Sequence, residues 1–60
     1  MNSSAIADVA YDPSSRTLQI TFRSGGTYTF HGVPADIYRG LITASSPGSF
    51  YHNHIRGRFR

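Results

Sequence analysis

The sequence predicts an α+β domain: a three-stranded antiparallel β-meander covered on one face by two C-terminal helices (β-β-β-α-α). Two stretches, 17–22 and 27–31, alternate polar and apolar residues without a break. Such alternation predicts strands with one buried and one wet face, because successive side chains of a strand point to opposite sides. Beyond residue 34, apolar residues recur at helical spacing. The chain has 60 residues, which is enough for one small domain.

The two alternating stretches predict a hairpin around which the other elements pack. If Phe22 lies opposite Tyr28 and Ile20 opposite Phe30, an odd number of residues must separate the two arms. This favours a three-residue loop, Ser24 to Gly26, in which Gly26 adopts the left-handed conformation that glycine tolerates best. The apolar face of the hairpin would then be continuous.

A first strand is expected from Ile6 to Tyr11, and Asp12-Pro13 is typical of a type I turn. A four-residue loop, Pro13 to Arg16, would pair Tyr11 with Leu18 and Val9 with Ile20. Alternation gives this strand two sides, with Ala7, Val9 and Tyr11 on one and Ile6 and Asp8 on the other.

Two helices should follow the sheet. Pro34 favours the first turn of a helix, and Asp36 suits its positive end. Ser45-Ser46-Pro47 repeats this pattern for a second helix that would run to about Arg56, with Gly57 as its stop. The face of the first helix that should cover the sheet comprises Ala35, Ile37, Tyr38, Leu41, Ile42 and Ala44. The apolar arc of the second comprises Phe50, Tyr51, His54 and Ile55.

Several stretches occur in one order that resembles the KTSC domain. They are Tyr11-Asp12-Pro13, residues 18–22, Gly25-Gly26, Tyr28-Thr29-Phe30, Gly32-Val33-Pro34 and residues 48–56. The family's central Tyr-x-Tyr is Tyr28-Thr29-Phe30 here, which lacks the second hydroxyl. In this family the domain forms the C-terminal part of some lysyl-tRNA synthetases and also stands alone as a small bacterial or phage protein. The resemblance covers nearly the whole chain, residues 4–59, and implies RNA binding.

The residues argue against an enzyme, a metal site and a cofactor. The three carboxylates, Asp8, Asp12 and Asp36, have structural roles as a sheet-surface residue, a turn residue and a helix-start residue. The chain has no cysteine, and no serine lies in a nucleophile elbow. His52 and His54 would point to opposite sides of a helix, and we expect His54 to be a core histidine packed against Phe50 and Tyr51.

The C-terminal end is the candidate binding site. All six basic residues are arginines, and three of them, Arg56, Arg58 and Arg60, fall within the last five positions. An arginine presents a planar fork of donors to a phosphate, and aromatic rings stack on unpaired bases. We therefore expect a nucleic-acid-binding accessory domain, with RNA favoured, either tRNA or single-stranded. The candidate site residues are Tyr51, His52, Asn53, Arg56, Arg58 and Arg60.

Two alternatives remain open at this level. The arginines can be a solvated tail, which is common at chain ends, or the domain can be a protein–protein or weakly self-associating module that docks through a strand edge or an apolar patch. The polar outer face of the predicted sheet, with Arg23 at its edge, is explained by strand propensity. No stretch is long and apolar enough to span a membrane, and the lack of cysteine suits a reducing compartment. Residues 1–5 have no basic stretch followed by an apolar run, so we expect no signal peptide. We expect one domain over 1–60, cytoplasmic, with residues 1–4 disordered and 57–60 forming a tail.

Overall fold

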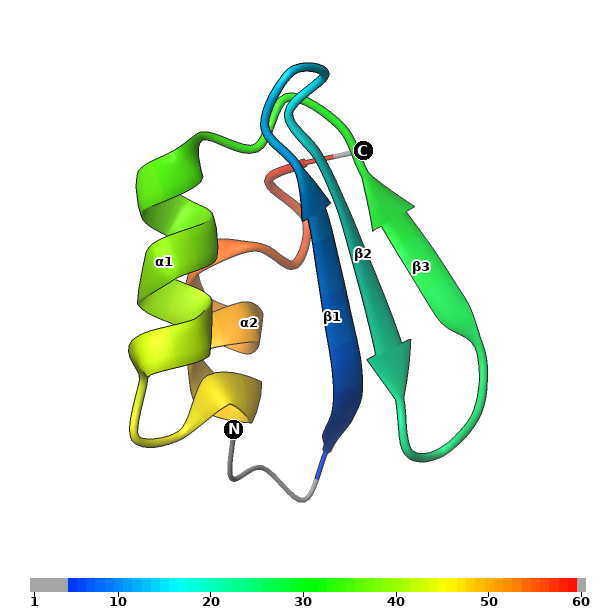
Figure 1. The fold of residues 1–60 in the computed structure, drawn as a ribbon. Helices are drawn as coiled ribbons and strands as arrows, with labels where there is room; N and C mark the ends of the chain where they lie inside the picture. The colour runs from blue at the N-terminus through cyan, green and yellow to red at the C-terminus, as the bar shows by residue number, and fades with distance from the viewer. Residues whose placement is uncertain (1–4, 60) are drawn as a thin grey trace.

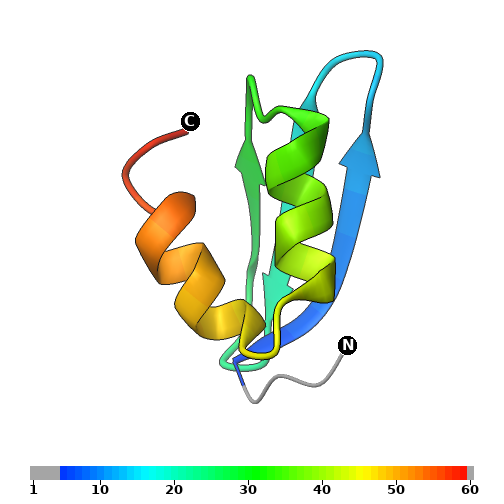
Figure 2. The ribbon, with the colours of Figure 1, turned by 90° about the vertical axis from the view of Figure 1, so that its left-hand side faces the viewer.

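A computed structural model describes residues 5–59 of the chain, so the expectation of disorder at 1–4 lies outside the described residues. Three strands, β1 (Ile6–Asp12), β2 (Thr17–Phe22) and β3 (Thr27–Phe30), are followed by two helices, α1 (Ala35–Thr43) and α2 (Pro47–His54). The strands form one antiparallel sheet in the order β1-β2-β3. Both helices lie on the same face of this sheet (Figures 1 and 2). The predicted α+β meander with two covering helices is confirmed.

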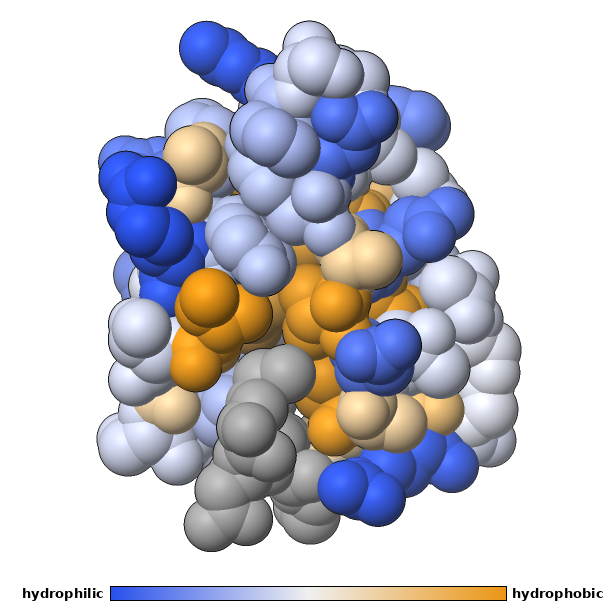
Figure 3. Space-filling view, viewed as in Figure 1, coloured by the Kyte–Doolittle hydropathy of each residue, from blue (hydrophilic) through white to orange (hydrophobic). Residues whose placement is uncertain are grey.

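The core lies between the sheet and the helices. Leu18 and Ile20 on the central strand are fully buried, as are Leu41 of α1 and Ile55 just after α2. The central strand contributes most because it has a neighbouring strand on each side and helices above it. The remaining buried apolar residues are Ile6, Phe30 and Val33. In the view of Figure 3, apolar side chains reach the surface in the seam between α1 and β1.

The first hairpin has the predicted register. Tyr11 pairs with Leu18 and Val9 with Ile20, and the loop spans residues 13–16. The assignment of Ile6 to the outer side is wrong, because the pairing shifts between Ile6 and Asp8 at a β-bulge. The extra residue in a bulge reverses the alternation beyond it. Ile6 therefore turns inward, where only 2% of its surface is exposed.

The loop of the second hairpin has an odd number of residues, as predicted, but the register of the strands differs from the prediction by two residues. Ile20 pairs with Tyr28, and Leu18 pairs with Phe30. The loop is Arg23 to Gly25, closed by a hydrogen bond that the Phe22 amide donates to the Gly26 carbonyl at 3.1 Å. Gly25 and Gly26 both have positive φ, +111° and +93°, so the glycine pair lets the chain reverse one residue earlier than expected.

Each helix packs over a different part of the sheet. Tyr38 of α1 stacks on Tyr11 of β1 with ring centroids 4.6 Å apart, and the Tyr11 hydroxyl donates to the Val33 carbonyl at 2.6 Å. Tyr51 of α2 meets Phe22 and Phe30 edge to face, at 5.0 and 5.9 Å. Helix α1 therefore covers the β1 side and α2 the β3 side, which is also the arrangement in Figure 2.

The helix boundaries and exposures correct four expectations. Pro34 is the residue before α1 and not its first helical residue, and Ile42 is 38% exposed at the margin of the face predicted to be covered. Helix α2 ends at His54, two residues before Arg56. His54 is exposed and not a core histidine, although its ring packs on Phe50 with centroids 4.4 Å apart. His54 is exposed because the ring of Phe50 occupies the contact with α1 at Gly40, and His54 lies one helical turn further along α2, beyond this contact.

Within residues 5–59, no helix lies over the other face of the sheet. Its exposed side chains are mainly polar, and the hydroxyls of Thr21 and Thr27 lie 2.9 Å apart across the β2–β3 pair. Hydrogen-bonded threonine pairs stabilise neighbouring strands, so this surface fits the structural explanation given from strand propensity. The same face carries Asp8 and Ala10 from β1, and Gln19 and Thr29 from β2 and β3.

Candidate nucleic-acid interface

The C-terminal end of α2 turns back toward the core. The amides of Ile55 and Arg56 both donate to the Tyr51 carbonyl at 2.9 Å, and the helix stops there. Gly57 then adopts a φ of +76°, in agreement with its predicted role as the stop. We expected residues 57–60 to form a tail. In the structure Phe59 is half-buried and packs against the core, so the segment is held at this point.

The structure places four of the predicted site residues in two contacts. The Arg56 Nη1 lies 3.4 Å from the His52 Nδ1, one helical turn away. The Arg58 Nε donates to the Asn53 carbonyl at 3.3 Å. All four residues are exposed. Because Asn53 lies in the last turn of α2, the Arg58 guanidinium also supplies a donor and a positive charge to the negative end of the helix.

The other two predicted site residues differ from these four. Tyr51 is half-buried, and its ring is occupied by edge-to-face contacts with Phe22 and Phe30. Tyr51 therefore helps to pack α2 on the sheet, and only part of its side chain is available at the surface. Arg60 lies outside the described residues.

An exposed aromatic residue that the sequence reasoning did not single out lies on β3. Tyr28 points to the same side of the sheet as the core residues, yet 56% of its surface is exposed. Its ring extends over Gly26, where a Cβ would lie 3.6 Å from Cε1, and meets Phe22 edge to face at 5.5 Å. The signal that could have found it is the glycine pair, since an early turn pairs Tyr28 with Ile20 and places Phe22 opposite Gly26, from where it meets the Tyr28 ring edge to face.

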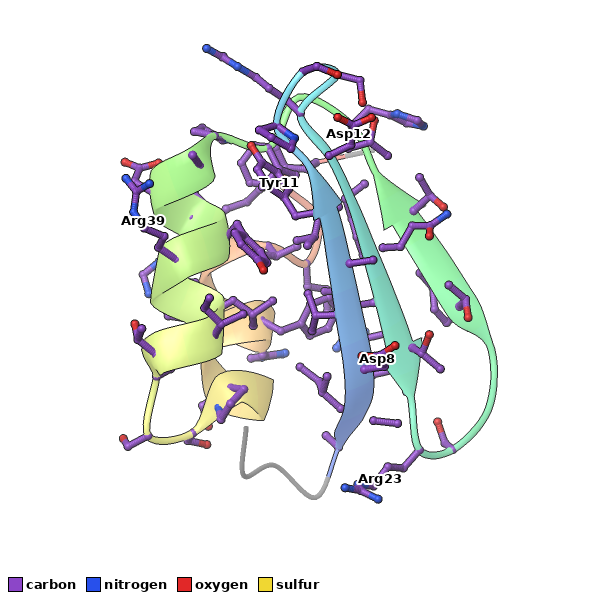
Figure 4. The ribbon with its side chains drawn as sticks, viewed as in Figure 1. Asp8, Tyr11, Asp12, Arg23 and Arg39 are labelled. Atoms are coloured by element: carbon purple, nitrogen blue, oxygen red, sulfur yellow. The ribbon has the colours of Figure 1, made fainter. Side chains whose placement is uncertain are left out.

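The pKa of one carboxyl group is perturbed. Asp12 Oδ1 accepts hydrogen bonds from the Ser14 hydroxyl at 2.7 Å and from the Ser14 amide at 3.0 Å. These bonds favour the ionised form and lower the pKa of Asp12 below its usual value. Figure 4 shows Asp12 at the end of the sheet near the β1–β2 loop, and Arg23 at the opposite end. The turn hydrogen bonds account for the perturbation, so it gives no reason to assign a catalytic role.

Within residues 5–59, no three side chains of His, Cys, Asp or Glu come close enough together to hold a metal ion. The same residues enclose no pocket. No helix in this part of the chain is long and apolar enough to cross a membrane. The arrangement offers a surface of guanidinium groups, imidazoles and aromatic rings.

Comparisons with known proteins place this arrangement in a family. The family model of the KTSC domain matches residues 2–59. A protein from Tsukamurella paurometabola is 37% identical over 60 residues, which are all of this chain and 90% of that protein. A lysine–tRNA ligase from Nostoc sp. is 36% identical over 50 residues, 83% of this chain but 9% of the ligase.

A solved structure supports the same assignment. The crystal structure of a KTSC domain protein from Yersinia pestis matches with a TM-score of 0.95 and 40% identity, covering all of this chain and 84% of that one. Agreement in sequence and backbone extends over the whole domain, and the ligase match shows that the same unit forms a small part of much larger proteins. The chain belongs to the KTSC domain family.

Proposed function

We propose that this protein is a small non-enzymatic, cytoplasmic nucleic-acid-binding domain that favours RNA and contacts phosphates through Arg56, Arg58 and Arg60. The observation that carries the proposal is the anchoring of the basic end. Phe59 packs against the core, and the exposed Arg58 bonds to the last turn of α2. A cationic group held in place loses less conformational entropy on binding than one on a mobile tail.

The chemistry of the segment suits a phosphate backbone. Guanidinium groups form charge-assisted, often bidentate hydrogen bonds with phosphate oxygens. His52 and Asn53 lie beside Arg56 and Arg58 and provide further polar contacts. Lysine–tRNA ligases that contain a similar stretch act on an RNA substrate, which supports RNA over DNA as the partner.

The test is a titration of the 60-residue protein against tRNA, single-stranded RNA and duplex DNA at several salt concentrations. Three neutralised phosphates should give a slope of log affinity against log salt of about −2 on single strands and about −2.7 on duplex. A triple Arg→Gln variant at positions 56, 58 and 60 should lose most of the affinity and most of the slope. Arg39→Gln, which removes an exposed arginine from α1, is the matched control and should bind as the parent does.

A second candidate function is a protein-docking or self-associating module, and the observation that favours it is the edge strand β3. This strand carries no charge, and its Tyr28 is exposed. Open edges can pair with another chain. Binding through such an edge changes little with salt. A folded triple variant that binds RNA as well as the parent would therefore remove the phosphate proposal and favour this module.

A further inference from the structure

The charges of the chain are divided between two sides of the molecule. Every carboxylate lies on β1 or α1, namely Asp8, Asp12 and Asp36. No acidic residue occurs from position 13 to 35 or after 36, so β2, β3, α2 and the C-terminal segment contain none. Of the six arginines, Arg56, Arg58 and Arg60 belong to the C-terminal segment, Arg16 and Arg23 lie in the two loops between the strands, and Arg39 lies on α1. His52 and His54 lie on α2, and His31 follows β3 directly.

The fold brings the carboxylate-free elements together. Tyr51 of α2 contacts Phe22 and Phe30, whereas Tyr38 of α1 contacts Tyr11 of β1. Helix α2 and β3 therefore lie on one side of the molecule, and β1 and α1 on the other, as Figure 2 shows. Asp8 and Asp12 are seen along β1 in Figure 4, with Arg39 on the outer surface of α1. We call the side of the molecule that is formed by β3, α2 and residues 55–59 the β3–α2 side.

An aromatic row crosses the β3–α2 side and ends at the surface. Consecutive rings meet edge to face from Phe30 to Tyr51, from Tyr51 to Phe22 and from Phe22 to Tyr28. The first three are buried or half-buried, and only Tyr28 is largely exposed. Since three rings hold the base of the row in place, Tyr28 presents a supported aromatic surface whose ordering on binding costs little entropy.

The aromatic row also sets the distance between Tyr28 and the basic end. Tyr51 lies two rings from Tyr28, and Arg56 follows Tyr51 by five residues. Ring centroids are 5.5 Å apart from Tyr28 to Phe22 and 5.0 Å apart from Phe22 to Tyr51, and Arg56 lies beyond Tyr51, past the end of α2 at His54. A nucleic-acid strand advances about 3.4 Å per nucleotide when stacked, so a strand that reaches both Tyr28 and Arg56 spans several nucleotides.

We propose that the β3–α2 side binds a single-stranded nucleic acid, with an unpaired base stacked on Tyr28 while Arg56 and Arg58 contact phosphates several nucleotides further along the strand. This inference rests on the proposed function and assigns its base-binding residue. The base must be unpaired because the ring of Tyr28 can stack only on the exposed face of a base and cannot fill a groove of a duplex. Any exposed base can stack on an aromatic side chain in this way. The absence of carboxylates on this side removes the repulsion that a phosphate backbone would otherwise meet.

The test compares Tyr28→Thr with the parent protein on a labelled oligouridylate of about twelve nucleotides and on an abasic strand of equal length and charge. Threonine preserves the strand propensity of the position. We expect a loss of affinity of about 5- to 150-fold on the oligouridylate, the range for one stacked base, with the salt slope unchanged. On the abasic strand the parent and the variant should bind equally.

Three control variants distinguish the stacking role from others. Tyr28→Phe keeps the ring and should bind as the parent does. Ile42→Ala removes an exposed apolar side chain from α1 and should leave binding unchanged. Arg56→Gln should reduce the salt slope, in contrast to Tyr28→Thr. A matching DNA oligonucleotide shows whether the 2′-hydroxyl contributes.

The outcomes separate this inference from the proposed function. If the parent binds with a salt slope that depends on Arg56 and Arg58, but Tyr28→Thr binds equally well, the stacking inference is wrong and the phosphate proposal stands. If Tyr28→Phe weakens binding as much as Tyr28→Thr, the hydroxyl and not the ring makes the contact, which also overturns stacking. If no nucleic acid binds and Tyr28→Thr instead abolishes a salt-insensitive self-association, both proposals fail and β3 is a protein-docking edge.

Discussion

The contact between Gly40 and Phe50 gives the sharpest test of how the two helices pack. A Cβ on Gly40 would lie 2.5 Å from the Phe50 Cζ and 2.8 Å from its Cε2. Carbon atoms in contact prefer about 3.5–4.0 Å, so the overlap is about 1 Å. The ring cannot retreat freely because its centroid lies 4.4 Å from that of His54. A methyl group at position 40 therefore forces the helices or the ring to shift.

Two opposing terms decide the effect of Gly40→Ala on the free energy of unfolding. Alanine in a helix interior is favoured over glycine by about 1 kcal/mol. Overpacking a well-filled contact costs about 1–3 kcal/mol. Because the overlap involves ring atoms and not the end of a flexible chain, we expect the upper part of that range and a net destabilisation of about 1–2 kcal/mol. For a domain of this size each kcal/mol corresponds to about 4–8 °C in melting temperature.

The assay is urea denaturation of the parent, Gly40→Ala, Phe50→Leu and the double variant. Leucine keeps an apolar side chain but does not reach Gly40 as the ring does. In the Phe50→Leu background only the helix-propensity term should remain, so Gly40→Ala should stabilise by about 1 kcal/mol. The sign of the effect should thus reverse, with a coupling free energy of about 2–3 kcal/mol.

A control variant and a clear refutation complete this test. Thr43→Ala on the same helix removes an exposed side chain whose hydroxyl donates to the Arg39 carbonyl at 2.7 Å. Such a bond to the preceding turn adds little to helix stability and alanine has the higher helix propensity, so stability should change by no more than a few tenths of a kcal/mol, which shows that α1 responds normally to alanine. If Gly40→Ala stabilises the parent protein, the ring moves aside without cost, and the close packing of α1 on α2 is not what determines the residue at position 40.

Four further results are expected. Phe30→Ala should destabilise by about 3–5 kcal/mol and Thr29→Ala by far less, and melts in the reverse order would show that the inner and outer faces are exchanged. Phe59→Ala should raise amide exchange in residues 55–58 more than in the sheet, whereas equal exchange would show that Phe59 does not hold the C-terminal segment. The Asp12 carboxyl should titrate below its usual pKa by NMR, and its stabilising contribution should be present above the unfolded-state pKa and lost as the pH falls through the folded-state value; a normal midpoint contradicts the Ser14 bonds. Zinc should leave the melting temperature and the His54 ring resonances unchanged, and a saturable shift at one equivalent would reveal a metal site.

The sequence by itself determined the order of the elements, the faces of β2 and β3 and the order of the layers. Alternation from 17 to 22 and from 27 to 31 assigned Leu18, Ile20 and Phe30 to the inner side, and all three are buried. The prediction that an odd number of residues separates the two arms of the main hairpin was correct, because it depends only on which side of the sheet each residue faces. The loop from 13 to 16 and the register of Tyr11 with Leu18 follow from turn chemistry, which is local in sequence.

Only the tertiary structure decided the features that depend on a neighbour far along the chain. The bulge that turns Ile6 inward and the exposure of His54 each depend on what packs against the residue and not on its own propensity. For the candidate site, the sequence located the arginines at 56 and 58. It could not show that Phe59 anchors them or that Tyr28 lies exposed on the same side, because both depend on how α2 packs over β3.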